Sequence, residues 1–118
     1  MPVQRDYILR LLEQAAAAVR RLRELLGAGT APSEEIVEEA RAAQAELFGN
    51  SWTLLQQVDV ATATSLVRDP RQLAMWAELL RVEAEASRAL GDSARAGQLE
   101  TRAAGIAEAA ARLAPPSR

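Results

Sequence analysis

One cluster of side chains has the composition of a metal-binding catalytic motif. Glutamates occur at Glu34, Glu35, Glu38 and Glu39. Residues three and four positions apart share one face of a helix, so carboxylates at this spacing can hold Mg²⁺ or Mn²⁺ together. A carboxylate–metal hydrolase that uses these four glutamates is therefore one function to consider.

The glutamate cluster is similar to the first metal motif of the all-α nucleoside-triphosphate pyrophosphohydrolases. Those enzymes need a second acidic pair, three residues apart, on the next core helix. Here Glu83 and Glu85 are two apart, and Glu78 is followed three positions later by Arg81. The simpler interpretation is a solvated helix start, where negative charge complements the helix dipole. We expect no catalytic residue, no bound metal and no cofactor.

The chain lacks three residue types that carry much of protein chemistry. It has no cysteine, no histidine and no lysine, so arginine supplies all 14 basic residues. Thiolate nucleophiles need cysteine, Schiff bases need lysine, and histidine is the commonest general base. Carboxylate, hydroxyl, guanidinium and one phenol remain for catalysis. The excess of arginine and alanine favours a bacterial source with a GC-rich genome.

Charge and hydropathy argue against two further classes of partner. The net charge is −2, which gives no reason to expect binding to nucleic acid. The longest run of small apolar residues, Ala15–Val19, is far shorter than the roughly 20 residues of a membrane span. Residues 1–6 lack the apolar core of a signal peptide. We expect a cytoplasmic protein without a nucleic-acid or membrane partner.

Apolar periodicity predicts a long first helix over residues 4–26. Its apolar side chains recur in unbroken steps of three and four. Gly27 and Gly29 are expected to end this helix. The densest basic group lies near its C-terminal end: Arg20, Arg21 and Arg23. In an antiparallel hairpin these arginines would meet the glutamates that begin the second helix, in exposed ion pairs that contribute about 0–1 kcal/mol each.

Capping residues predict the other helices. The second helix should begin near Pro32 or Ser33 and end at Gly49. Two short helices are expected in the connector, the first capped by Asn50 or Ser51 and the second by Asp59. Asp69 begins a long helix, with Gln72 able to reach back to the cap, and Asp92 begins the last helix. The predicted buried stripes of these two helices are Leu73, Trp76, Ala77, Leu80, Ala84 and Ser87, then Ala96, Leu99, Ala103, Ile106, Ala110 and Leu113.

These elements predict a single all-α domain over residues 1–118, a small bundle of five or six helices. Two antiparallel hairpins, 4–48 and 69–113, are joined by the connector 50–68 and followed by a frayed tail, 114–118. The many alanines allow close helix approach but bury little area each. A modest core in a small chain favours self-association.

The C-terminal hairpin resembles a tetratricopeptide unit. Small residues fall at that repeat's spacing, at Ala84, Gly91, Ala96 and Ala103. Leu80 stands in place of the repeat's tryptophan and Glu100 in place of a large apolar residue. Tetratricopeptide proteins bind peptide segments in a groove built by several stacked repeats. One pair of helices does not build such a groove.

Over its full length the chain is similar to a family of short bacterial proteins of unknown function. The shared opening is Arg5-Asp6-Tyr7-Ile8-Leu9-Arg10-Leu11-Leu12-Glu13. An acid-rich helix, a Gly-Asp turn and an Ala-rich helix complete the resemblance. It implies an all-helical fold and no activity.

The first helix offers the candidate functional surface. Its apolar residues recur at heptad-like spacing over about three heptads, which favours pairing with a second copy as a two-fold dimer. The candidate interface residues are Ile8, Leu11, Leu12, Ala15, Ala18, Val19, Leu22 and Leu25. We expect a non-enzymatic protein–protein interaction or scaffolding module, a homodimer whose other protein partner is unidentified. A binder of a small apolar ligand between the hairpins is an alternative to this and to the hydrolase.

The few aromatic residues are the other candidates for a role in binding. Trp52 and Trp76 are interpreted as bulky core residues, with a ligand pocket as the alternative. Tyr7 is expected either at an interface or in simple packing.

Overall fold

Six α-helices make up most of the chain, and the computed structural model, which describes residues 2–115, has no strand within that range. The helices are α1 Pro2–Ala28, α2 Ser33–Phe48, α3 Trp52–Leu55, α4 Val60–Leu66, α5 Pro70–Ala89 and α6 Ser93–Leu113. A 3-10 turn, Gly49–Ser51, leads from α2 into α3. The prediction of an all-α bundle with five or six helices is confirmed. Residues 116–118 of the predicted tail lie outside the described residues.

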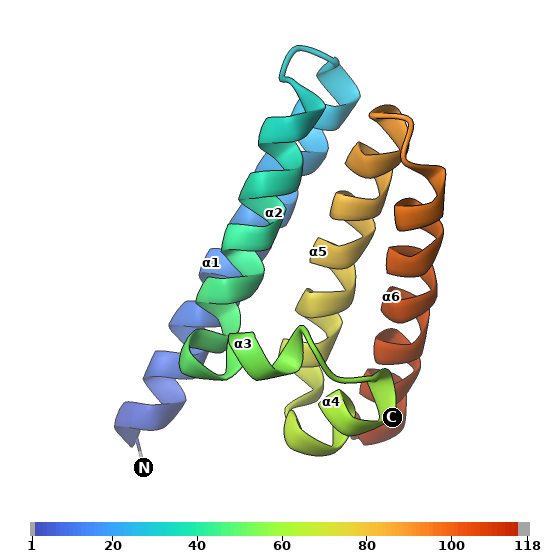
Figure 1. The fold of residues 1–118 in the computed structure, drawn as a ribbon. Coiled ribbons are helices and arrows are strands. Elements are labelled where there is room, and N and C mark those ends of the chain that lie inside the picture. The colour runs from blue at the N-terminus through green and yellow to red at the C-terminus, as the bar shows by residue number, and fades with distance from the viewer. Residues whose placement is uncertain (1, 116–118) are drawn as a thin grey trace.

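The helices form two antiparallel hairpins joined by the short ones. α1 pairs with α2 and α5 pairs with α6, while α3 and α4 connect the hairpins at the lower end of the molecule (Figure 1). α5 packs against α1, α2 and α6. It is therefore the central helix of the bundle.

Aspartate caps begin three of the helices, as the sequence predicts. Asp59 Oδ1 accepts from the Thr62 N–H at 2.8 Å, and Asp92 Oδ1 accepts from the Arg95 N–H at 3.1 Å. Asp69 Oδ1 accepts from the N–H groups of the second and third residues of α5, at 2.8 and 3.4 Å. These bonds satisfy N–H groups that have no partner within the helix.

Three local predictions at the helix ends differ from the structure, and one is confirmed. Gly27 lies inside α1, and Gly29, with φ 66°, follows its end. The predicted start of α2 near Pro32 or Ser33 is confirmed, since Pro32 occupies the N-cap position and the helix begins at Ser33. Ser51, the last residue of the 3-10 turn, occupies the N-cap position of α3, but its side chain makes no capping hydrogen bond. The Gln72 side chain donates to the Leu47 carbonyl at 3.4 Å instead of reaching back to Asp69, and so links α5 to the end of α2.

The burial of α5 extends beyond its predicted stripe. All six predicted residues are buried, and four more are buried on other sides of the helix: Leu79, Val82, Glu83 and Ala86. The reason is that three helices surround α5, so a single apolar face does not describe it. On α6 the predicted stripe is confirmed except at Leu113, which is exposed at the last turn, and Ala109 is buried as well.

The unequal lengths of α1 and α2 leave one end of α1 without a hairpin partner. α1 has 27 residues and α2 has 16. At 1.5 Å per residue, the excess corresponds to roughly 16 Å of helix. Figure 1 shows the N-terminal turns of α1 continuing past the end of α2.

Asp69→Ala is expected to lower the free energy of unfolding by about 1 kcal/mol, because it removes the acceptor for two N–H groups of α5. Asp69→Asn is the matched control, since asparagine caps helices about as well.

The Arg71 side chain holds the pKa of Asp69 below its ordinary value, so the stabilisation by this cap is complete at neutral pH and is lost as the pH falls through that lowered pKa. Urea denaturation over this pH range measures both effects. An alanine variant as stable as wild type at neutral pH would contradict the role of the cap.

Candidate functional site

The eight residues predicted to form an interface on α1 divide into three that are buried and five that are partly buried. Ala15, Val19 and Leu22 are buried in the core clusters that α1 shares with other helices of the same chain. Around Leu22, for example, lie Ile36 of α2 and Val82 of α5. These three residues are not accessible to a second copy, which corrects the prediction of a seam along the whole helix. The other five are partly buried: Ile8, Leu11, Leu12, Ala18 and Leu25.

Residues 7–12 of α1 form a mostly apolar segment that the rest of the chain covers only in part. Between these positions, Arg10 is the one charged residue. Leu11 and Leu12 pack against the core, whereas Tyr7 is 57% exposed and Leu9 is 40% exposed. This partly covered stretch, residues 7–12, is called here the uncovered segment.

An apolar groove runs between α1 and α5 next to this segment. It has a volume of about 410 Å³, and its walls are Leu9, Leu12 and Ala16 of α1 with Ala74 and Met75 of α5. Two charged residues stand at its edges: Glu13 and Arg71. The groove, called here the α1–α5 groove, therefore joins the uncovered segment to the central helix.

The glutamate cluster lies at the start of α2 and is mostly exposed. Glu39 accepts a hydrogen bond from Arg21 Nη1 at 3.1 Å, which is the predicted contact between the two helix ends. In the described part of the chain, no three acidic side chains come close enough together to hold a metal ion. Arg23 does not join this contact and turns toward α5 instead.

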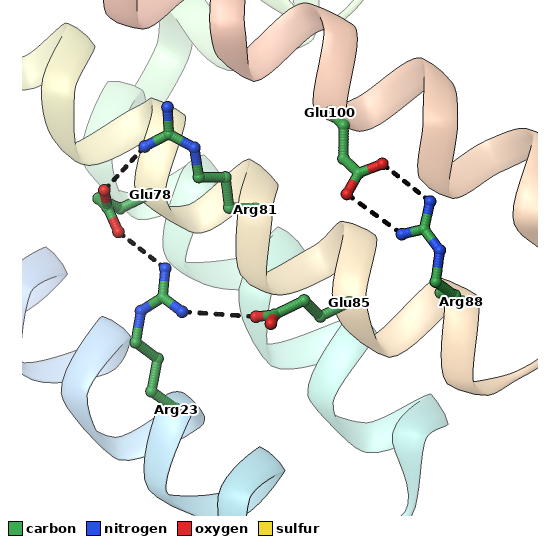
Figure 2. A network of polar contacts seen from close by, with 6 residues as sticks. All are labelled: Arg23, Glu78, Arg81, Glu85, Arg88 and Glu100. Carbon is green, nitrogen blue, oxygen red and sulfur yellow. Dashed lines mark hydrogen bonds and ion pairs between the residues drawn. The ribbon is translucent and has the colours of Figure 1, made fainter.

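Arg23 belongs to an ion-pair network along one face of α5 (Figure 2). Its guanidinium donates to Glu78 at 2.8 Å and to Glu85 at 3.4 Å, and Arg81 also donates to Glu78. These contacts hold the pKa of Glu78 below its ordinary value, with the Arg23 hydrogen bond as the largest cause. The network thereby aligns α1 with α5, although each exposed pair contributes only about 0–1 kcal/mol.

A second pair in Figure 2 joins α5 to α6. Arg88 donates two hydrogen bonds to the carboxylate of Glu100, at 2.8 and 3.1 Å. Hydrogen bonding to Arg88 lowers the pKa of Glu100. Glu100 therefore has an ionic partner on the neighbouring helix α5.

A buried polar chain crosses the other side of α5. Trp76 Nε1 donates to Gln44 Oε1 at 3.2 Å, and Gln44 Nε2 donates to Glu83 Oε1 at 2.9 Å. All three side chains are buried. Glu83 Oε2 accepts from Arg41 Nε at 3.1 Å and lies 3.6 Å from Arg95 Nη2. This buried polar chain of side chains thus connects α2, α5 and α6 and ends in arginine side chains that reach the surface.

Three aromatic residues pack together next to the buried polar chain. Trp76 is fully buried and contacts the ring of Phe48 edge to face, with centroids 4.9 Å apart. Trp52 is partly buried and stacks on Phe48 at 6.3 Å. Trp76 is therefore a core residue as predicted, whereas Trp52 also lines a cavity. Tyr7 is not part of the core.

The cavity beside Trp52 is polar and lies between α2, α3, α5 and α6. Its volume is about 230 Å³. Three arginines line it together with Glu83: Arg41, Arg95 and Arg102. Arg102 stands over the Trp76 ring at 5.2 Å and donates to the carbonyls of Leu55 and Val58 at 2.7 and 2.8 Å. This arginine cavity is a separate feature from the α1–α5 groove.

The arginine cavity was not predicted from the sequence. A signal was present, because Gln44 lies between Ala40 and Leu47 on the buried stripe of α2, and Glu83 adjoins Ala84 on α5. A polar residue at a core position needs a buried partner. The two residues are 39 positions apart, so the sequence does not show that they are partners.

Comparison of the chain with protein-family models, curated proteins and solved structures found no match in any of the three. Within the described residues, no helix has the length and apolar content needed to cross a membrane.

Gln44→Ala is expected to lower the free energy of unfolding by about 2–3 kcal/mol, because it leaves the Trp76 N–H and one oxygen of Glu83 buried without their partner. Gln98→Ala is the matched control, since Gln98 lines the same cavity but is exposed, and a change within about 0.5 kcal/mol is expected there. Chemical denaturation followed by circular dichroism measures both variants. Equal stabilities would contradict a structural role for the buried chain.

Proposed function

We propose that the chain is a non-enzymatic interaction module that pairs with a second copy of itself through the uncovered segment and the α1–α5 groove. The observation that carries this proposal is the uncovered segment itself. Leu11 and Leu12 of this segment pack on the core, but two of its largest side chains, Tyr7 and Leu9, are exposed. Such a surface is typical of a contact site between proteins.

A second copy fits this surface because each copy carries both halves of the contact. The N-terminal turns of one α1 supply an apolar helix, and the α1–α5 groove of the other supplies apolar walls. A two-fold arrangement forms both contacts at once, which doubles the buried area. The contact remains small, so we expect association at micromolar rather than nanomolar concentration.

Charge on α1 favours an antiparallel pairing centred on Leu9. Arg5, Leu9 and Glu13 are spaced four apart and so share one face of the helix. With Leu9 on the two-fold axis, Arg5 of each copy lies opposite Glu13 of the other. The pairing therefore places apolar residues at the centre and opposite charges at its ends.

Leu9→Glu is expected to abolish self-association while leaving the monomer folded, because Leu9 is 40% exposed and a surface change costs within about 0.5 kcal/mol. Leu66→Glu is the matched control, since Leu66 is 54% exposed on α4, which packs on α6. Analytical ultracentrifugation between 5 and 200 µM measures the association of wild type and both variants.

Charge-reversal variants of Arg5 and Glu13 test the proposed pairing in the same ultracentrifugation experiment. Arg5→Glu and Glu13→Arg should each weaken the dimer, and the double variant should restore it. A wild type that stays monomeric over this range, or a Leu9→Glu variant that still dimerises, would overturn the proposal. Native mass spectrometry of the same samples identifies a retained small apolar ligand, which would assign the groove to that ligand instead of a second copy.

A further inference from the structure

The arginine cavity carries more positive charge than its single carboxylate balances. Arg41 and Arg95 both approach Glu83, whose side chain is 3% exposed. In the described part of the chain, Arg102 pairs with no carboxylate and donates instead to two backbone carbonyls. The lining residues therefore include three guanidinium groups and one carboxylate.

We propose that this cavity binds a small phosphate monoester, with the phosphate between Arg95 and Arg102. A dianion matches the two positive charges that the lining residues leave unbalanced. Guanidinium groups suit phosphate because each has five N–H donors for its oxygens. Arg102 gives one N–H of each terminal nitrogen to the Val58 and Leu55 carbonyls, and its other N–H groups make no hydrogen bond to the described residues.

Donor geometry shows which N–H groups are available to such a ligand. Arg41 uses Nε for Glu83, so its two terminal nitrogens make no hydrogen bond to the described residues. Arg95 lies 3.6 Å from Glu83, an ion-pair distance that is too long for a hydrogen bond. Both arginine side chains are about half exposed, so a ligand can reach them from solvent.

The surroundings of Arg102 hold its guanidinium in place before any ligand arrives. Its hydrogen bonds to the Leu55 and Val58 carbonyls fix the position of the guanidinium, and the group also makes a cation–π contact with the Trp76 ring. Burial lowers the pKa of Arg102, and the nearby charge of Arg95 lowers it further, while Asp59 raises it. An anion between the two arginines relieves their mutual repulsion.

The lining of the cavity extends beyond its charged residues. The remaining wall combines apolar and amide groups, with Trp52, Leu80 and Leu99 beside Gln56 and Gln98. A short organic group on the phosphate would fill this part.

Titration with inorganic phosphate and with glycerol 3-phosphate at constant ionic strength tests the proposal. Trp52 lines the cavity, so intrinsic fluorescence reports binding directly. We expect saturable binding at millimolar concentration or below, tighter for the monoester, with succinate as a dicarboxylate comparison at least fivefold weaker. Arg95→Gln should weaken phosphate binding at least fivefold. Arg112→Gln, on the same helix but paired with Glu108 outside the cavity, should bind as wild type does.

A second variant keeps the test valid if Arg95→Gln disturbs the fold. Gln98 is exposed at the cavity, so Gln98→Glu adds a negative charge without touching the buried chain, and it should also abolish binding. Three results would overturn the proposal. They are a fluorescence change that follows ionic strength alone, unchanged affinity in both cavity variants, and succinate binding as tight as phosphate binding. None of these results depends on whether the chain dimerises.

Discussion

The position of α5 at the centre of the bundle decides which surfaces of the chain remain free. α1, α2 and α6 surround this helix, and its side chains pack toward all three. α5 begins at Pro70, where the aspartate cap fixes its first turn, and this end of α5 lines the α1–α5 groove beside Leu9 and Leu12. The long first helix continues past the end of α2 (Figure 1). The exposure of Tyr7 and Leu9 thus accompanies the unequal lengths of α1 and α2.

The same central position places a charge inside the bundle. Glu83 is buried because its side of α5 faces α2 and α6, and burying an unpaired carboxylate would be costly. Gln44 and Arg41 from α2 and Arg95 from α6 supply the partners. Because these partners come from two helices, their hydrogen bonds and ion pairs with Glu83 fix how α2 and α6 lie against α5. The arginines that neutralise Glu83 also line the cavity, so a packing requirement creates its positive lining.

Local signals in the sequence were sufficient for most helix starts. Asp59, Asp69 and Asp92 cap helices because each cap uses neighbouring N–H groups and needs no tertiary contact. Gly49 ends α2 for the same local reason, with φ 56°. Periodicity was less informative for α5, since a helix with neighbours on three sides has no single apolar stripe.

Tertiary features required information that is distant in the sequence. The heptad-like pattern of α1 does not indicate that α5 covers Leu22 and leaves Leu9 exposed, because that depends on where α5 starts and how far it reaches. Arg23 was expected to meet the glutamates of α2, but Glu78 and Glu85 on α5 lie closer. The arginine cavity unites residues from four helices, and no single segment contains its pattern.

The central claim is that two copies pair about a two-fold axis at Leu9, and a single engineered thiol tests it most directly. The chain has no cysteine, so Leu9→Cys carries one thiol, and a disulfide requires Cα atoms about 4.4–6.8 Å apart. Mild oxidation at tens of micromolar protein should convert Leu9→Cys rapidly to a covalent dimer, and Leu66→Cys only slowly through chance collisions. Equal rates of cross-linking in the two variants, read from a non-reducing gel over time, would contradict the claim.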